Sequence, residues 1–182
     1  MAEATAARAH PPGAGARVAV NLLPPAARLS FRGGEEAAEA CGRAFGCVLP
    51  RAGCRADERG DRAALWLGPD EWLLLAPEGD GSALSAAIEA ALADVPHSLV
   101  DVSHRQVAFR VEGREAATLL NAGCPLDLDA SAFPAGMCTR TVLAKCDVVL
   151  WRRGPELFRL EVNRSFADYL AGFLREAERG VG

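Results

Sequence analysis

The chain has 182 residues, of which 50% are hydrophobic and 24% charged, and its formal net charge at pH 7 is −4. These totals are typical of one globular unit or of two small lobes that share a core. The acidic balance argues against nucleic acid or an anionic membrane surface as the main partner, because binding to either needs a basic footprint.

The chain also lacks the sequence signals of secretion and of membrane insertion. Its first twenty residues contain no apolar segment of the length found in signal peptides, and no run of about 18 apolar residues is present to span a membrane. The six cysteines form no C-x-x-C pair, and the three histidines are not spaced as structural zinc ligands are. We therefore expect a cytoplasmic protein with buried, reduced thiols.

The N-terminal residues predict a flexible arm. Residues 1–27 are rich in Ala, Pro and Gly and show no hydrophobic periodicity. Such a segment does not bury enough apolar surface to fold alone. We expect this arm to be disordered in isolation or laid along a partner.

The rest of the chain contains two pairs of similar stretches, which predict an internal duplication. LSFRGGEEAAEACGRAFGC (29–47) resembles VAFRVEGREAATLLNAGC (107–124), and LWLGPDEWLLLAP (65–77) resembles LWRRGPELFRLEV (150–162). Two copies of one supersecondary unit explain this spacing, which is nearly constant apart from one insertion, more simply than chance does. We therefore expect two related lobes in one compact unit, at residues 28–96 and 97–182.

Each copy predicts the same elements in chain order: a strand, an amphipathic helix, a hairpin that turns at Gly-Pro, and a second helix. In the first copy these are residues 29–33, 35–44, 63–67 with 71–76, and 81–93. In the second copy they are residues 107–111, 114–121, 142–151 with 156–162, and 165–178. Strands and helices without strict alternation favour an α+β fold of antiparallel sheets, each with helices packed on it.

The ends and faces of these helices carry further signals. A Gly-Cys pair follows the first helix of each copy, which is typical of a helix C-terminus. Ser82 and Ser165 are candidate N-caps of the closing helices. The last helix has apolar residues at i, i+3 and i+4 spacing, which predicts one buried face made of Phe166, Tyr169, Leu170, Phe173 and Leu174.

The stretch DVSHR at residues 101–105 contains the residue types of a hydrolase active site. If residues 99–105 are extended, successive side chains alternate faces, so Ser103 and His104 point in opposite directions. The chain also has no G-x-S-x-G elbow. These features favour a structural role for His104, such as holding a turn between strands, over a catalytic triad with Asp101.

Cys138 is the candidate for a reactive thiol, because it lies two residues before Arg140 and cationic surroundings activate thiolates. Arg140 and Lys145 suit contact with an acidic partner or an anion equally well. The other five cysteines lie in apolar or loop contexts. No G-x-G-x-x-G or P-loop motif indicates a nucleotide site.

NAGCPLDLDASAFPAGM, at residues 121–137, predicts a long loop, because its seventeen residues show little periodicity. Loops of this length inside compact domains are uncommon and often functional. This loop is also rich in large apolar side chains. Two interpretations remain open: burial between the two lobes, or a contact surface for another chain.

Several motifs, in this order, resemble the gamma subunit of heterotetrameric sarcosine oxidase. They are LGPDEWLL (67–74), VDVSHR (100–105), LLNAGCPLDL (119–128), FPAGMCTRT (133–141), VLWR (149–152) and RSFADYL (164–170). DVSH followed by a strand and G-x-x-A-x-x-L-L is also similar to the folate-binding domain of glycine-cleavage aminomethyltransferases. That kinship implies the same two-lobe fold.

The resemblance implies membership of a complex of alpha, beta, gamma and delta subunits. Such a complex oxidatively demethylates sarcosine to glycine, produces hydrogen peroxide and transfers the one-carbon unit to tetrahydrofolate. The resemblance places FAD, covalent FMN, NAD and tetrahydrofolate on alpha and beta, and zinc on delta. It implies no catalytic residue, cofactor or metal in this chain.

Two hypotheses follow. The first is a non-catalytic subunit that serves assembly and stability; the alternative is a free-standing folate-binding one-carbon transfer protein. Under the first hypothesis, the 121–137 loop and the face around two arginines meet the alpha or beta chain. The candidate interface residues are Arg105, Cys124, Pro125, Leu126, Phe133, Pro134 and Arg140.

Overall fold

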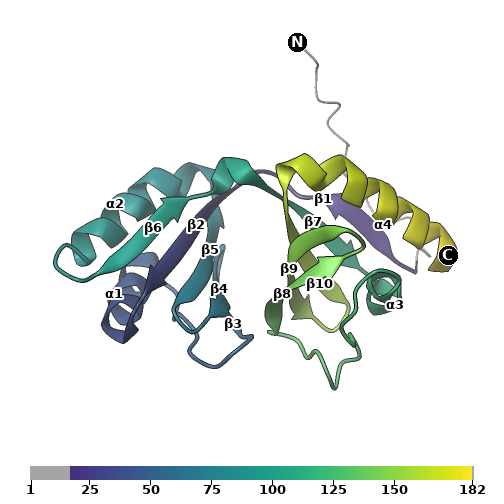
Figure 1. Ribbon diagram of the computed structural model, residues 1–182, viewed down its shortest axis with the longest axis horizontal. Helices are drawn as coiled ribbons and strands as arrows, with labels where there is room; N and C mark the ends of the chain where they lie inside the picture. The colour runs from purple at the N-terminus through teal and green to yellow at the C-terminus, as the bar shows by residue number, and fades with distance from the viewer. Residues whose placement is uncertain (1–16, 182) are drawn as a thin grey trace, which may run out of the picture.

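The computed structural model describes residues 17–181 and places them in two five-stranded antiparallel sheets (Figure 1). The first sheet and its helices comprise β2 (Ala26–Gly33), α1 (Glu35–Phe45), β3 (Ala56–Arg59), β4 (Arg62–Gly68), β5 (Glu71–Pro77), α2 (Gly81–Ala91) and β6 (His97–Asp101). The second sheet and its helices comprise β1 (Ala19–Leu22), β7 (Gln106–Glu112), α3 (Ala116–Asn121), β8 (Cys138–Leu143), β9 (Cys146–Gly154), β10 (Leu157–Asn163) and α4 (Ala167–Val181). The predicted α+β fold is confirmed.

The two sheets have the same strand order. The first runs β3-β4-β5-β2-β6, and the second runs β8-β9-β10-β7-β1. The helices also follow equivalent strands, so both halves share the order of elements that the sequence repeat predicts. Their origin by duplication stays a prediction.

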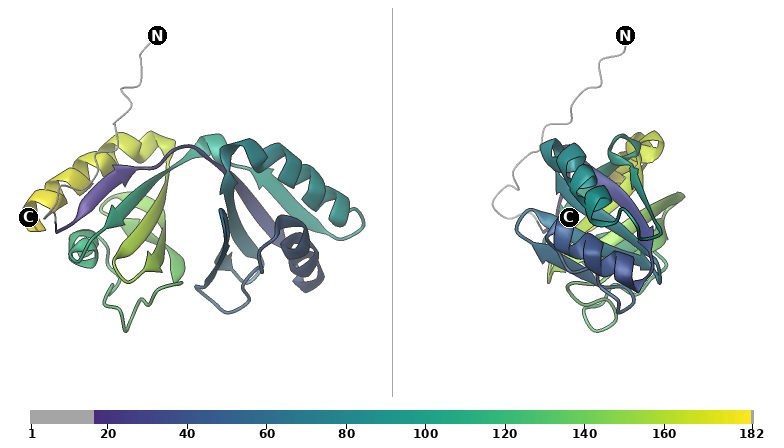
Figure 2. Two further views of the ribbon diagram at one scale, coloured as in Figure 1. Left: turned by 180° about the vertical axis from the view of Figure 1, so that it is seen from behind. Right: turned by 90° about the vertical axis from the view of Figure 1, so that its left-hand side faces the viewer.

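The halves exchange their first strands, as the crossing connections in Figures 1 and 2 show. β1 precedes β2 in the chain but pairs with β7, and β6 precedes β7 but pairs with β2. The expected division at residue 97 therefore differs from the sheets, because β6 completes the first sheet. The arm at residues 1–27 was also drawn too long: residues 19–22 form β1, and only residues 1–16 of it lie outside the described residues.

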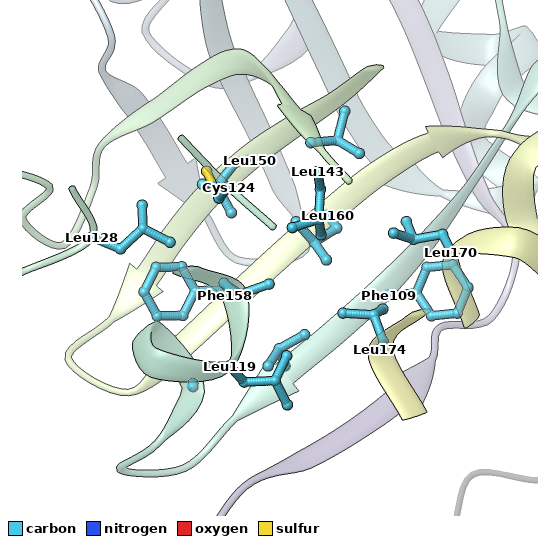
Figure 3. Close-up of a cluster of buried hydrophobic side chains, with 14 of the residues drawn as sticks. Phe109, Leu119, Cys124, Leu128, Leu143, Leu150, Phe158, Leu160, Leu170 and Leu174 are labelled. Carbon is cyan, nitrogen blue, oxygen red and sulfur yellow. The ribbon is translucent and has the colours of Figure 1, made fainter. Parts of the chain in front are cut away.

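Helices cover the outer face of each sheet, and the two inner faces meet (Figures 1 and 2). Side chains alternate along a strand, so β5 directs Trp72 and Leu74 towards α1 and α2. It directs Leu73 and Leu75 towards Val149 and Trp151 of β9, in the apolar cluster between the sheets. Figure 3 shows the third cluster, which packs the second sheet against α3 and α4.

The predicted Gly-Cys helix ends are confirmed. Gly46 caps α1 with φ 88°, and its amide donates to the carbonyl of Gly42. After α3, a Cβ at Gly123 would lie 2.5 Å from Cζ of Phe173, so glycine is needed for the close approach of α4. Both hairpins turn at the predicted Gly-Pro pairs, between β4 and β5 and between β9 and β10.

Three local predictions are wrong. Residues 142–151 are not one strand, because Ala144 adopts φ 54° and turns the chain between β8 and β9. Neither serine caps its helix: α2 already begins at Gly81, and Ser165 lies within a 3₁₀ turn before α4. These 3₁₀ turns continue directly into the helices, which moves the start of each helical segment upstream of the serine.

The predicted apolar face of α4 is only partly buried. Leu170 and Leu174 are fully buried, but Phe166 and Tyr169 are exposed. α4 has 15 residues. Within residues 17–181, no helix is long and apolar enough to cross a membrane.

Candidate functional site

The layer between the sheets has an apolar half and a polar half. β4, β5, β8 and β9 supply the apolar cluster. In β2 and β10, by contrast, the inward positions are Arg28 and Ser30, and Arg159, Glu161 and Asn163. Polar groups that face another sheet need partners, because an unpaired buried polar group costs free energy.

A buried ion cluster joins the two sheets in this polar half. Nε of Arg28 lies 2.6 Å from Oε2 of Glu161, and the two side chains are only 2% and 1% exposed. Nε of Arg159 lies 2.7 Å from Oε1 of the same carboxylate. One carboxylate thus pairs with two guanidinium groups. Buried pairs of this kind depend on their geometry, because each charge has lost its water.

Beside this cluster, a cleft of about 510 Å³ opens between the sheets. Its lining includes two of the predicted interface residues, Arg105 and Arg140, which the structure brings to the same cleft. The rest of the lining is Ser30, Leu67, Glu71, Leu73, Val102, Gln106, Thr141, Val142, Asp147, Val148, Val149, Glu161 and Asn163. This volume is in the range of small-molecule pockets.

Arg140 is already engaged within the chain. Its Nη1 lies 3.0 Å from Oε2 of Glu71, and its Nη2 donates to the other carboxylate oxygen. This bidentate bond lowers the pKa of Glu71 below 4.5. Arg105 is exposed and makes no ion pair with another residue of the described range 17–181. Of these two arginines, Arg105 is therefore the one whose guanidinium is available to pair with a group outside the described residues.

The stretch DVSHR is not an extended strand, contrary to expectation. β6 ends at Asp101, and Ser103 to Arg105 form a 3₁₀ turn. The amide of Ser103 donates to Oδ1 of Asp101 at 2.8 Å, and Oγ of Ser103 accepts from the amide of Arg28 at 2.9 Å. The Ser103 hydroxyl and amide lower the pKa of Asp101.

These bonds assign a structural role to the motif. Asp101 and Ser103 hold the connection between β6 and β7 against β2. His104 lies in that turn, as predicted, but its side chain is exposed, and the bonds that fix the turn come from its neighbours. Ser103 binds backbone groups here, so the triad interpretation is not supported.

Cys138 is not a reactive thiol. It is fully buried between the sheets, and its sulfur contacts the carbonyls of Arg55 and Trp66. Burial raises the pKa of Cys138 to about 12. All six cysteines are free, and only Cys54 is not buried. No group of three or more His, Cys, Asp and Glu residues in the described range could hold a metal ion.

The predicted long loop is irregular after α3, but its apolar residues pack within the second half. Cys124, Leu128 and Phe133 belong to the core cluster of the second sheet, as Figure 3 shows for the first two. Nη1 of Arg152 donates to the carbonyls of Leu128 and Phe133, at 3.1 and 2.9 Å. The large apolar residues of the loop therefore pack beneath the second half. Its end also bonds to the first half: the carbonyl of Gly136 accepts from the amide of Ala56, and Met137 pairs with Arg55.

This packing divides the predicted interface residues. Cys124 and Phe133 are buried, so their side chains offer no surface to a partner, and their assignment to an interface is corrected. Pro125, Leu126 and Pro134 remain partly or fully exposed. Their contact with another chain stays a prediction.

Sequence reasoning missed the inter-sheet ion cluster. Polar residues alternate with apolar ones in β2 and β10, and this pattern is typical of a strand with one solvated face. The polar positions of both strands carry residues able to form ion pairs, namely Arg28, Arg159 and Glu161. Their opposite charges indicate that an ion pair is possible, but the sequence does not specify which strands face each other.

Comparisons with known proteins agree with this architecture. A profile of the family described as "Sarcosine oxidase, gamma subunit family" matches residues 33–179. The sarcosine oxidase subunit gamma of Corynebacterium sp. strain P-1 is 36% identical over 139 residues, which are 76% of this chain and 68% of that protein. The same subunit of strain U-96 is 36% identical over 135 residues, or 74% of this chain and 65% of that protein.

Two solved structures are similar over most of the chain. Heterotetrameric sarcosine oxidase from Corynebacterium sp. U-96, in complex with pyrrole 2-carboxylate, contains a chain with a TM-score of 0.85 and 32% identity, covering 92% of this chain and 87% of that one. Aminomethyltransferase T from Bartonella henselae has a TM-score of 0.66 and 15% identity, covering 87% of this chain and 45% of that one. The second likeness concerns the fold alone. The profile match over residues 33–179 and the relative of strain P-1 show that the chain belongs to the sarcosine oxidase gamma subunit family.

Proposed function

We propose that this chain is a non-catalytic gamma subunit of a heterotetrameric sarcosine oxidase. The observation that carries the proposal is its likeness, over 92% of its length, to a chain of such an enzyme. The complex would demethylate sarcosine with dioxygen as oxidant, giving glycine and hydrogen peroxide. Tetrahydrofolate would take up the one-carbon unit as its methylene derivative.

In this proposal the chain serves assembly and stability, and alpha, beta and delta subunits carry the chemistry. FAD, FMN, NAD and tetrahydrofolate would be held by alpha and beta, and zinc by delta. The surroundings of the two candidate catalytic residues support a non-catalytic role for this chain. Cys138 is buried with a raised pKa, and the carboxylate of Asp101 is used to hold a turn.

The experiment is purification of the tagged chain from its source cell, followed by identification of bound proteins and an absorption spectrum. We expect larger subunits and a flavin spectrum in the eluate, with sarcosine-dependent peroxide formation. A colourless eluate without larger partners would refute the proposal.

We further propose that the cleft mouth around Arg105 contacts another subunit. Arg105→Glu is the sharper variant, because Arg140→Glu would also place a second carboxylate opposite Glu71. Arg43→Glu, on the exposed outer helix α1, is a matched control. We expect the Arg105 variant to recover less partner than the control, and equal recovery would remove Arg105 from the interface.

The inter-sheet cleft keeps the folate-binding alternative testable, because its volume of about 510 Å³ suits a small molecule. Titration of the isolated chain with tetrahydrofolate separates the two functions. Our proposal predicts no saturable binding in the micromolar range. Micromolar binding that Arg105→Glu weakens would favour the alternative.

A further inference from the structure

Four buried side-chain nitrogen atoms have no hydrogen-bond partner within the described residues 17–181. They are Nη2 of Arg28, Nε of Arg110, Nε1 of Trp151 and Nη2 of Arg159, whereas the only such oxygen atom is Oε1 of Gln106. Each of the four nitrogens can donate a hydrogen bond but cannot accept one. Because a buried donor without an acceptor costs free energy, the interior of this chain is short of acceptors.

Three of these donors lie in one row across the second sheet. Arg159 of β10 is paired with Arg110 of β7 on one side and with Trp151 of β9 on the other. Residues directly opposite each other in an antiparallel sheet project to the same face, and Trp151 belongs to the apolar cluster between the sheets. Arg159 is therefore the central member of a row of donors that faces the first sheet.

The charge around Arg159 is also unbalanced. Arg28 and Arg159 share the single carboxylate of Glu161, so these three side chains together have one net positive charge. Hydration of this charge is limited, because Arg28 and Glu161 are almost completely buried. An anion that reaches Arg159 would compensate the charge in a layer where water screens it poorly.

Arg159 and Trp151 line a pocket of about 440 Å³ between the two halves. Residues 23–25, which connect β1 to β2 and are called the connector 23–25, form one apolar wall of this pocket. Ala63 and Leu75 of the first sheet add further apolar surface. Small-molecule sites have volumes in this range and combine an apolar wall with a few polar groups.

The other charged residues of the pocket are already paired or exposed. Arg62 donates to a backbone carbonyl at 2.9 Å, and Arg153 pairs with Glu58. Asp61 lies in the exposed turn between β3 and β4, where water and salt screen its charge. The pocket's buried donors without a partner in the described range are therefore those of the donor row.

We propose that this pocket binds a small monocarboxylate with an apolar body. The carboxylate accepts from Nη2 of Arg159 and from Nε1 of Trp151, and it compensates the excess positive charge of the ion cluster. The apolar body lies against the connector 23–25 and Leu75. A water molecule also accepts hydrogen bonds, but it leaves the charge uncompensated.

The test follows the indole N–H signals of the isotope-labelled full-length chain by nuclear magnetic resonance. The chain has three tryptophans, and Trp151→Phe identifies the signal of Trp151. Nε1 of Trp72 already donates to the carbonyl of Pro50 at 2.8 Å, so the Trp72 signal is the internal control. Benzoate is the probe, and benzamide at the same ionic strength is its neutral counterpart.

We expect benzoate to shift the Trp151 signal saturably and to leave the Trp72 signal in place. Benzamide should bind at least about tenfold more weakly, because hydrogen bonds to a charged group are the stronger ones.

Arg159→Gln removes the excess charge and leaves Glu161 paired with Arg28, so it should weaken benzoate binding at least about tenfold. Arg153→Gln is the matched control, because Arg153 lines the same pocket but already pairs with Glu58. It should change the affinity less than about fivefold.

The absence of a saturable Trp151 shift with benzoate up to about 10 mM would overturn the inference. Equal binding of benzamide, or unchanged benzoate affinity in folded Arg159→Gln, would also overturn it. Circular dichroism and the melting temperature check folding. If Arg159→Gln does not fold, the comparison of benzoate with benzamide on the wild-type chain decides the question. Every one of these results leaves the proposed role in assembly intact, because partner recovery tests that role separately.

Discussion

At the scale of single residues, Glu161 forms the buried ion pair that joins the two sheets. Its carboxylate accepts from Arg28 and Arg159, which come from different sheets. Nη2 of each arginine is buried without a protein partner. Because the cluster contains two arginines and one glutamate, it has one more positive than negative charge. Its only compensating charge is the carboxylate of Glu161.

Glu161→Gln should destabilise the chain by roughly 3–5 kcal/mol, because it leaves two buried guanidinium groups uncompensated. Urea unfolding followed by circular dichroism measures the loss. Glu71→Gln is the control: its partner Arg140 is largely exposed, so about 1 kcal/mol or less is expected. Equal, small losses in both variants would show that the buried cluster does not hold the sheets together.

Thiol accessibility gives a second prediction at this scale. Only Cys54 is not buried among the six free cysteines, and burial raises the pKa of Cys41 and Cys138 to about 12. Iodoacetamide at pH 8 should therefore modify Cys54 first in the folded chain. Peptide mass spectrometry before and after denaturation identifies the sites. Rapid native modification of Cys138 would restore the reactive-thiol hypothesis.

The Glu71–Arg140 pair predicts a pH dependence. Arg140 lowers the pKa of Glu71 from 4.5, so the stabilisation is present above pH 4.5 and is lost as the pH falls through the lower, folded-state value. The melting temperatures of the wild type and Glu71→Gln should differ at pH 7 and converge in acid. A difference that stays constant down to pH 3 would contradict this assignment.

At the scale of elements, the exchange of β1 and β6 binds the two halves together. β1, which leads directly into β2 of the first sheet, pairs with β7 of the second sheet. β6, which leads directly into β7 of the second sheet, pairs with β2 of the first sheet. The chain crosses between the halves twice, at residues 23–25 between β1 and β2 and at residues 102–105 between β6 and β7. DVSHR therefore serves a connection that the fold needs.

The attachment of β1 depends on a close approach at Gly113. This residue has φ 122°, and a Cβ there would lie 2.4 Å from the carbonyl oxygen of Arg17. Gly113→Ala should displace the residues that lead into β1 and destabilise the chain by roughly 1–3 kcal/mol. Hydrogen exchange should show faster exchange of the β1 amides.

Gly60→Ala is the control for this variant, because Gly60 has φ 59° but open space around its Cα. An alanine at position 60 is strained by the positive φ, as one at position 113 is, but its Cβ meets no other atom within 4 Å. If both variants leave the exchange of β1 amides unchanged, Gly113 does not hold this strand.

Much of the element order could be predicted from sequence, because hairpins, Gly-Pro turns and helix ends are set by neighbouring residues. The β8–β9 turn was missed because Ala144 and Lys145 carry no turn signal, and only the φ of 54° at Ala144 reveals it. The strand exchange was missed because pairing between distant strands leaves no local mark. Phe166 and Tyr169 were placed in the core because periodicity cannot separate a buried apolar side chain from an exposed one at the edge of the same face.

The candidate site was predictable in part. Arg105 and Arg140 do meet in one cleft, although no sequence signal showed that Glu71 already binds Arg140. Cys124 and Phe133 were assigned to a surface because the loop is irregular, yet irregular chain can still pack a core. Arg152 ties the loop to the second sheet by donating to two of its carbonyls, and no local sequence signal indicates this bond.

At the scale of the whole molecule, the chain is a two-sheet scaffold with a cleft between the inner faces of its sheets. The candidate reactive groups, Cys138 and Asp101, are respectively buried between the sheets and bonded within a turn. These features support the proposed role in contacts with other subunits.

The most direct test compares the sarcosine-oxidising complex from cells with and without the gene for this chain. We predict that the complex lacking the chain is recovered in much lower amount or dissociates faster. The proposed function places the flavins on other subunits, so those subunits should keep them. An intact, equally abundant and equally stable complex without the chain would contradict the account, as would flavin bound to the chain alone.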